Sequence, residues 1–351
     1  MNPRFRFATF CLLGLITCQA ARPQSVDNPG PLFPVEQNGK FGYIDKTGKI
    51  VIPLQYSDAL KFSDGLAAVH PGEREYDPGR RKQIIQHGFI DLTGQMIIPP
   101  RYLATMFYEG LAAVEEYSVG WLPAGPKWGF IDKTGQMVIP PQYDWVSRFS
   151  EGLVHVQNYE RLKGKGGYID KTGKIVIPLQ YSDAGEFSEG LAEVKTGGKW
   201  GFIDKTGQMV IPAKYDKAGK FSEGLVQVKA GKWGYIDKTG QMVIPPQFSE
   251  AFGFSEGLAE VKTGGKWGFI DKTGQMIIPS QYDMTSSFYE GLAAVKTGGK
   301  WGYIDKTGQM IISAQYYEAA SFFDGLAEVS IGQGKLGFID KAGKYVWAPS
   351  K

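Results

Sequence analysis

Evenly spaced aspartates are the first residues in this chain that could do chemistry, because carboxylates bind calcium and transfer protons. They end nine copies of the string Gly-(Phe/Tyr)-Ile-Asp: Asp45, Asp91, Asp132, Asp170, Asp204, Asp237, Asp271, Asp305 and Asp340. A calcium-binding solenoid would place several carboxylates in each turn, whereas here each copy has one. Each aspartate precedes Lys-Thr-Gly or a near match, so its carboxylate can accept the N–H groups of that turn. We therefore expect structural aspartates and no metal or cofactor.

The acids of a second string, Phe-x-(Asp/Glu)-Gly-Leu, have the same structural interpretation. This string occurs eight times, and Glu189 and Glu223 are examples.

Tryptophan also recurs in this pattern, and its ring could stack on a sugar or a peptide. The copies are Trp128, Trp200, Trp233, Trp267 and Trp301. The alternative is structural, because a buried tryptophan holds stacked hairpins together efficiently. We favour the structural role and keep a carbohydrate- or small-ligand-binding module as the second hypothesis.

The sequence contains none of the short motifs of common enzymes. His70, His87 and His155 lie in different local contexts, and no nucleophile elbow, zinc-protease helix, phosphate loop or dinucleotide fingerprint is present. Cys11 and Cys18 both lie in the first 20 residues, so the rest of the chain has no thiol for catalysis, zinc or a disulfide. Paired carboxylates of a glycosidase leave no short motif. We expect a non-catalytic protein and rank a carbohydrate-active enzyme last.

Composition and charge narrow the class of protein. The 351 residues include 47 glycines, 13% aromatic residues and only 21% charged residues, which is typical of short strands joined by tight turns. The net charge is +3, and removal of Arg4 and Arg6 with a leader would leave 37 basic against 36 acidic residues. A nearly neutral protein offers no electrostatic surface for nucleic acid or an anionic membrane.

Residues 1–20 resemble a secretory signal peptide. Arg4 and Arg6 precede an apolar stretch of about ten residues, which is too short to span a bilayer because that requires ~20. We expect export to the periplasm, the outer membrane or the exterior, with no transmembrane segment after signal removal.

Two processing sites compete. Cleavage after Ala20 would release a soluble protein. A lipoprotein signal would end before Cys18 and place a lipid anchor on that residue, although Thr17 is unusual before such a cysteine. Residues 21–31 are then expected to form a polar, flexible leader.

The elements that carry these residues are predicted as strands in nine repeated units over residues 32–351. In one unit, Leu191–Lys195 and Trp200–Asp204 are strands joined by a Gly-Gly turn, and Gln208–Ile211 is a third strand. Pro212 ends the third strand, because proline cannot donate to a β-ladder. The segment Tyr215–Gly224 is predicted as an irregular crossover to the next unit. Each unit is therefore expected to have three antiparallel strands.

The repeated strings resemble the WG repeat family, also called KWG repeats, of bacterial proteins. The resemblance rests on Lys-Trp-Gly-Phe-Ile-Asp-Lys-Thr-Gly followed by an apolar strand and Pro-Pro-x-Tyr, and it extends from Leu32 to about Trp347. Phe41, His87, Gly166 and Leu336 replace the tryptophan in four copies. The resemblance implies a β-rich tandem array that is often exported, and it implies no common activity.

Two architectures fit nine units. Both terminal units have their own strands, and no blade is visibly shared between the termini as in most β-propellers. Units of about 34 residues are also short for a four-stranded blade. We therefore predict an open β-solenoid or superhelix, with a propeller-like ring as the alternative.

Length variation points to a candidate binding surface. Three consecutive units lengthen the turn between their first and second strands, at residues 70–86, 115–126 and 157–165, while units five to eight keep two or three residues there. Equivalent turns project from one edge of a repeat array. Drifted, solvated insertions are the competing explanation. These loops carry residue types that recognition surfaces use: Arg74, Tyr76, Arg80, Arg81, Tyr117, Trp121, Tyr159 and Arg161.

The sequence therefore predicts a non-catalytic binding or scaffold protein of the bacterial envelope. Its expected partner is a protein, or else a glycan.

Overall fold

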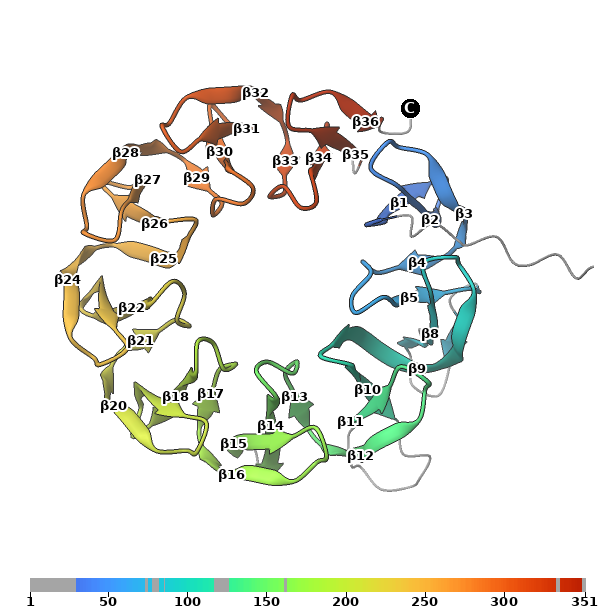
Figure 1. Ribbon diagram of the computed structural model, residues 1–351, viewed down its shortest axis with the longest axis horizontal. Coiled ribbons are helices and arrows are strands. Elements are labelled where there is room, and N and C mark those ends of the chain that lie inside the picture. The colour runs from blue at the N-terminus through green and yellow to red at the C-terminus, as the bar shows by residue number, and fades with distance from the viewer. Residues whose placement is uncertain are drawn as a thin grey trace, which may run out of the picture.

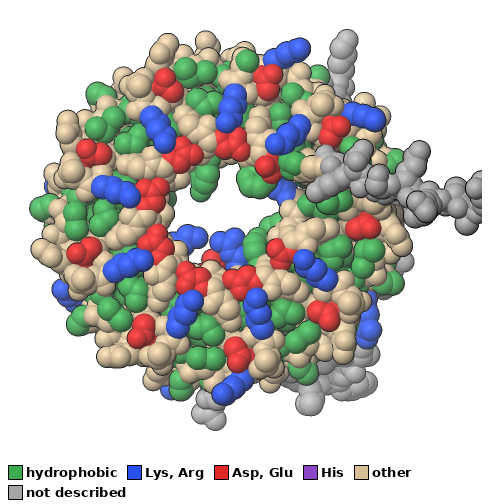
Figure 2. Space-filling view, viewed as in Figure 1, with side chains coloured by type: hydrophobic (Ala, Val, Ile, Leu, Met, Phe, Trp, Pro, Cys, Tyr) green, Lys and Arg blue, Asp and Glu red, His purple; other side chains and the backbone are tan. Residues whose placement is uncertain are grey.

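Nine small antiparallel units, here called blades, stand side by side in a ring, and two of them share one seven-stranded sheet (Figure 1). The ring surrounds an open central channel (Figure 2). The computed structural model describes residues 30–72, 75–77, 82–84, 86–116, 126–160, 163–332 and 335–348. Strands are the only regular elements in these ranges. The chain is all-β, as its glycine-rich, alternating sequence predicts.

Most blades contain four strands, and blade 5 is a regular example. It consists of β17 (Asp183–Ala184), β18 (Leu191–Thr196), β19 (Lys199–Asp204) and β20 (Met209–Tyr215), in that order across the sheet. The prediction of three strands is wrong because the crossover is not irregular. Asp183 and Ala184 pair with β18, and a turn then returns the chain into β18.

The other regular blades repeat this order. Blade 4 contains β13 (Trp145–Val146), β14 (Leu153–Glu160), β15 (Lys163–Asp170) and β16 (Ile175–Tyr181). Blade 6 contains β21 (Lys217–Ala218), β22 (Leu225–Ala230), β23 (Lys232–Asp237) and β24 (Met242–Phe248). Blade 7 contains β25 (Glu250–Ser255), β26 (Leu258–Thr263), β27 (Lys266–Ile270) and β28 (Met276–Tyr282). Blade 8 contains β29 (Met284–Thr285), β30 (Leu292–Thr297), β31 (Lys300–Asp305) and β32 (Met310–Tyr316). Blade 9 contains β33 (Glu318–Ala319), β34 (Leu326–Ser330), β35 (Leu336–Asp340) and β36 (Tyr345–Trp347).

The first three blades depart from the pattern. In its described residues blade 1 has three strands, β1 (Phe33–Gln37), β2 (Lys40–Ile44) and β3 (Ile50–Tyr56). Blade 2 contains β4 (Asp58–Ala59), β5 (Ala67–His70), β8 (His87–Ile90) and the first part of β9 (Met96–Tyr108). The second part of β9 pairs with β10 (Leu111–Glu116) and begins blade 3, which β11 (Lys127–Asp132) and β12 (Met137–Tyr143) complete. A separate hairpin, β6 (Glu75–Asp77) and β7 (Lys82–Ile84), lies within the loop of blade 2.

The hydrophobic core is divided among the joints between successive blades. At the joint of blades 5 and 6, Phe202 of one blade lies edge-on to Phe221 of the next, with 5.1 Å between ring centroids. Both rings are at most 1% exposed. The same pairing recurs at all eight joints from blade 1 to blade 9, with centroid distances of 4.8–5.1 Å. An edge-on aromatic pair adds stability beyond its buried area, so each joint has an equivalent anchor.

The ring closes between blade 9 and blade 1, and the prediction of an open array is therefore wrong. Phe33 of blade 1 and Phe338 of blade 9 form the ninth aromatic pair at 5.6 Å, within one hydrophobic cluster. Gly48 of blade 1 packs against Val346 of blade 9, as Gly207 packs against Ile177 at a regular joint. Closure here uses side-chain packing between two blades, so no shared blade is required.

Local sequence changes fit blade 1 to this closing joint. In its described residues blade 1 has no inner strand and hence no Phe-x-(Asp/Glu)-Gly turn. Phe33 stands where other blades carry a small residue such as Ala192, so its ring fills space that the missing phenylalanine would occupy. Pro34 lies on the uncovered edge of β1, where a residue without an N–H leaves no unpaired donor.

Candidate functional site

The ring has two faces, which differ in their connections. On one, the turn face, the Phe-x-(Asp/Glu)-Gly turn joins the first two strands of a blade and the Asp-Lys-Thr-Gly turn joins the last two. On the other, the hairpin face, hairpins join the second and third strands. The long loops belong to the hairpin face.

The repeated aspartates are engaged in turn structure, which confirms their predicted role. Oδ1 of Asp204 accepts the N–H groups of Thr206 and Gln208 at 2.9 and 3.0 Å and the Thr206 hydroxyl at 2.6 Å. The hydroxyl bond, followed by the backbone N–H groups, lowers the pKa of Asp204. The other eight aspartates make the same pair of backbone contacts. No group of three or more His, Cys, Asp or Glu side chains in the described part of the chain could hold a metal ion.

The acids of the other turn tie neighbouring blades together. Glu151 of blade 4 accepts the Gly190 N–H of blade 5 at 3.1 Å and pairs with Lys205 of blade 5 at 3.0 Å. Six such lysine–glutamate pairs have N–O distances of 3.0–3.1 Å. Figure 2 shows the acids around the channel mouth with lysines beside them. These acids are structural, but their contacts run to the next blade rather than to their own turn as those of the aspartates do.

These acids occupy a backbone conformation that side chains seldom adopt. All eight have φ between 51° and 54°, in the left-handed region, which costs about 1–2 kcal/mol for a residue other than glycine. The contacts to the next blade offset this cost. The pattern continues across the closing joint, where Lys46 of blade 1 lies 4.0 Å from Asp324 of blade 9. Leu92 replaces the lysine in blade 2, next to the one blade that has no turn acid in its described residues.

The predicted binding loops leave the hairpin face of three consecutive blades. They connect β5 to β8, β10 to β11 and β14 to β15, so their bases share one sector of the ring. The prediction of a loop over residues 157–165 is wrong, because β14 and β15 stay paired as far as Glu160 and Lys163, and this third loop is an extension of the hairpin. Arg74, Arg80, Arg81, Tyr117, Trp121 and Arg161 lie outside the described residues. Tyr76 lies in β6, described by its backbone alone. Tyr159 is 50% exposed.

The base of the third loop is held by Asp144. Its Oδ2 accepts the Tyr159 N–H at 2.7 Å, and its Oδ1 accepts a bond from Lys127 Nζ at 2.6 Å. Burial opposes ionisation of Asp144, but these two donors outweigh it and lower its pKa. The loop is thus anchored to blade 3 as well as to blade 4.

Two histidines meet at the base of the first loop, which the sequence analysis did not anticipate. His70 and His87 take the places of the lysine and tryptophan of regular copies, and their ring centroids are 6.3 Å apart. Nδ1 of His70 lies 2.7 Å from the Gln86 carbonyl oxygen, joining the two ends of the loop. Nε2 of His87 lies 3.7 Å from Asp58, and burial is the main cause of the lowered pKa of His87. In the repeat, the two histidines stand at positions that face each other across the hairpin. Comparing those two positions between copies could have revealed this cluster.

The repeated tryptophans contact the joints but do not dominate them. Trp128, Trp200, Trp233 and Trp301 pack at the margin of joint clusters and remain partly exposed, whereas Trp267 is buried. Lysine side chains lie over the rings of Trp200, Trp267 and Trp301. The predicted structural role is therefore correct in location, but phenylalanine and tyrosine provide most of the buried packing.

A family model described as WG containing repeat matches eight segments: 41–69, 88–117, 128–160, 167–200, 200–232, 233–267, 267–301 and 301–334. The chain belongs to the WG repeat family. Each matched WG repeat begins near the tryptophan position of one blade and ends in the next blade. A WG repeat therefore contains a whole joint, which explains why joint contacts are its most regular feature.

Comparisons beyond the family are distant. No curated protein matches the chain. Among solved structures, a protein of unknown function from Bacteroides caccae is 15% identical with a TM-score of 0.26, over 53% of this chain and 90% of that one. The acylaminoacyl peptidase of Pyrococcus horikoshii is 10% identical with a TM-score of 0.38, over 78% and 57%. The WD40 β propeller domain of Doa1 is 11% identical with a TM-score of 0.32, over 63% and 86%. Such scores carry no argument about function.

One position in the second strand varies between WG repeats in polarity. It holds His155, Glu193, Gln227 and Glu260 in blades 4–7. Glu260 is 3% exposed and accepts hydroxyl bonds from Thr285 and Ser287 of blade 8, each at 2.7 Å. Burial raises the pKa of Glu193 to about 8 and lowers that of His155 to about 4. The position therefore adjusts the fit of each joint.

Proposed function

We propose that this WG repeat protein is a non-catalytic binding scaffold that engages a protein partner through the loops of blades 2–4. The supporting observation is that these three consecutive blades carry the longest excursions between their second and third strands, where blades 5–8 turn with one or two glycines. The recurring charged groups of the turn face are occupied in contacts within or between blades. The loops add arginine, tyrosine and tryptophan residues that the short hairpins of blades 5–8 lack.

The residue types of these loops and the anchoring of their bases support the same sector of the ring as the binding surface. Arginine, tyrosine and tryptophan are the residues that most often carry binding energy at protein interfaces. The histidine cluster and Asp144 fix the bases of two of the loops, which limits the entropy lost when a partner binds. A rigid ring that presents anchored loops is suited to a recognition role.

Loop replacement tests this proposal. Each long connection is replaced by Thr-Gly-Gly, the turn of the regular blades, and native and shortened proteins are compared for partner capture and for affinity to each purified partner. The control is Tyr289→Ser, which gives an exposed turn-face residue the identity found at Ser188. We expect the shortened protein to lose at least ~10-fold in affinity and the control to retain it. If the shortened protein binds each partner as tightly as the native protein, the loops act only as spacers and the proposal is wrong.

We also propose that the protein is exported to the cell envelope. Residues 1–29, which include the expected signal sequence, lie outside the described part of the chain. Among the described residues, no helix is long and apolar enough to cross a membrane. The intact mass of the mature protein tests export: a chain beginning after Ala20, or an acylated Cys18, supports it. An unprocessed Met1 in the cytosolic fraction contradicts it.

A further inference from the structure

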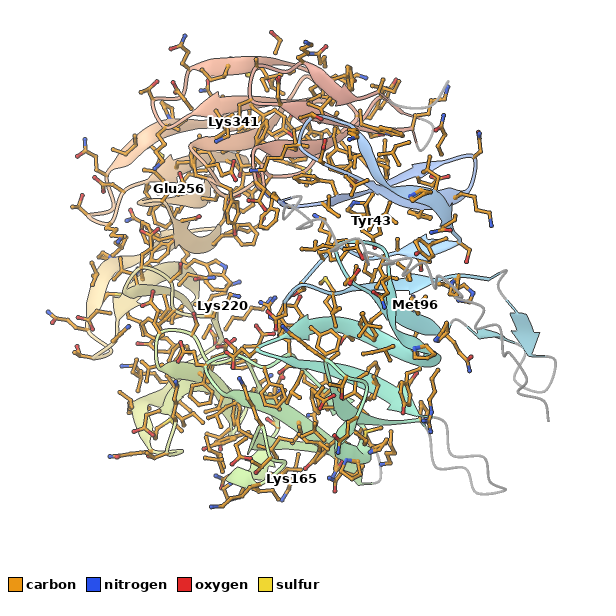
Figure 3. All side chains as sticks on the ribbon, turned by 45° about the vertical axis from the view of Figure 1, so that its right-hand side comes forward. Tyr43, Met96, Lys165, Lys220, Glu256 and Lys341 are labelled. Atoms are coloured by element: carbon orange, nitrogen blue, oxygen red, sulfur yellow. The ribbon has the colours of Figure 1, made fainter. Side chains whose placement is uncertain are left out.

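A pocket of about 340 Å³ opens between blades 3 and 4. Its wall includes Trp128 and Ala113 of blade 3, Arg148 of blade 4 and Glu186 of blade 5. Arg148 is equivalent to Lys220 of blade 6, which Figure 3 shows on the channel side of its blade. The volume falls within the range of small-ligand sites, which is about 300–1,000 Å³.

Local sequence differences open this pocket. In blade 6 the equivalent of Ala113 is Gln227, whose side chain lies against Gly219, the residue after the inner strand. In blade 5 a lysine, Lys195, lies 5.7 Å from the centre of the Trp200 ring. Blade 3 has the short Ala113 at the first position, and at the second it has Glu115, the buried cross-strand partner of Trp128, in place of the lysine.

The polar groups of the pocket are held in fixed positions. Nε of Arg148 donates to Glu186 Oε2 at 3.0 Å, and the guanidinium carbon lies 5.0 Å from the centroid of the Tyr108 ring. The arginine side chain remains 42% exposed and the glutamate 24% exposed. The pocket therefore offers a strong donor next to a strong acceptor, and the two charges cancel.

We infer that this pocket binds a neutral saccharide unit. A sugar ring has an apolar face that stacks on an indole ring, and its adjacent hydroxyls need both donors and acceptors. An anionic ligand would be attracted by Arg148 but repelled by Glu186, and a cationic ligand would be attracted by Glu186 but repelled by Arg148. Neither therefore gains net attraction. This inference does not depend on the loops.

Calorimetric titration of the full-length protein tests the inference. The probes are glucose, N-acetylglucosamine, maltose and cellobiose, with glucuronate and glucosamine as charged counterparts. We expect at least one neutral probe to bind saturably with a Kd below about 10 mM, and the charged counterparts to bind more weakly. Absence of saturable binding by all four neutral probes, or tighter binding of a charged probe, would overturn the inference.

A filled pocket provides the matched control. Ala113→Gln with Thr105→Gly installs the pair that blade 6 carries as Gln227 and Gly219, so the fold already accommodates it. The same change in blade 8 is Ala294→Gln with Ser286→Gly. We expect the blade 3 change to weaken saccharide binding at least ~10-fold and the blade 8 change to have no effect.

A second variant covers the case in which the filled pocket does not fold. Arg148→Gln removes the donor at the partly exposed wall, and circular dichroism confirms the fold of each variant. We expect it also to weaken saccharide binding. Unchanged binding in a folded pocket variant would place the saccharide elsewhere.

Discussion

Replacing Phe221 by alanine removes one ring of the aromatic pair that joins blades 5 and 6. Phe221 is 1% exposed and lies 5.1 Å from Phe202. Truncation of a buried phenylalanine costs ~3–5 kcal/mol, and an edge-on partner adds ~0.5–1.5 kcal/mol to what is lost. We therefore expect Phe221→Ala to reduce the free energy of unfolding by about 4 kcal/mol.

Trp200 belongs to the same cluster and provides the comparison. Its side chain packs at the margin and is partly exposed, so part of its surface already contacts water before truncation. We expect Trp200→Ala to cost roughly 2 kcal/mol, less than the fully buried range. Urea denaturation followed by circular dichroism measures both losses, with agreement between probes as the check of two-state unfolding.

The order of the two losses is decisive. If Trp200→Ala is as costly as Phe221→Ala, the tryptophans hold the blades together and the assignment of the joints to phenylalanine and tyrosine is refuted. A loss near zero for Phe221→Ala would also refute it.

Three further predictions concern other contacts. Burial raises the folded-state pKa of Glu193 from its ordinary 4.5 to about 8, so native stability falls as pH rises between these values and then levels off. Glu193→Gln should therefore melt higher than the native protein at about pH 8.5 and nearly the same at about pH 4. Glu151→Ala should lower the free energy of unfolding by about 1–2 kcal/mol. Glu151→Gly should lower it less, because glycine adopts the φ of 54° at this position without strain. Equal losses of the two variants in urea denaturation would contradict this. Phe33→Ala should cost ~3–5 kcal/mol by opening the closing joint, and a native denaturation midpoint would show that Phe33 is dispensable.

The sequence predicts the strands well because their signals are local. Glycine and proline mark the turns, and apolar alternation marks the second and third strands, as in Leu191–Lys195. The inner strand is missed because only two of its residues pair, Asp183 and Ala184, and two residues cannot show a period. Pairing there is decided by the turn that follows.

Ring closure could not be predicted from the repeat pattern, because it depends on the small rotation between blades. Two departures from the repeat nonetheless carry the information once the joints are known. Phe33 replaces a small residue, and Leu92 replaces a lysine that would have no acid to pair with. The histidine cluster of blade 2 depends on cross-strand pairing, so residues 17 apart in the chain become neighbours only after register is fixed. The aspartates were predictable because their partners lie within four residues.

Thiol crosslinking across the closing joint tests the ring most directly. Cys11 and Cys18 are first replaced by serine, which leaves no other thiol in the chain. Lys46→Cys with Asp324→Cys then places a pair across blades 9 and 1, and Lys306→Cys with Glu256→Cys places the equivalent pair across consecutive blades 7 and 8. A short thiol-specific crosslinker is applied at high dilution, and intramolecular products are measured by mass spectrometry. The closed ring predicts comparable crosslinking of both pairs within one chain. Efficient crosslinking of the blade 7–8 pair alone, with free thiols at positions 46 and 324, would contradict closure.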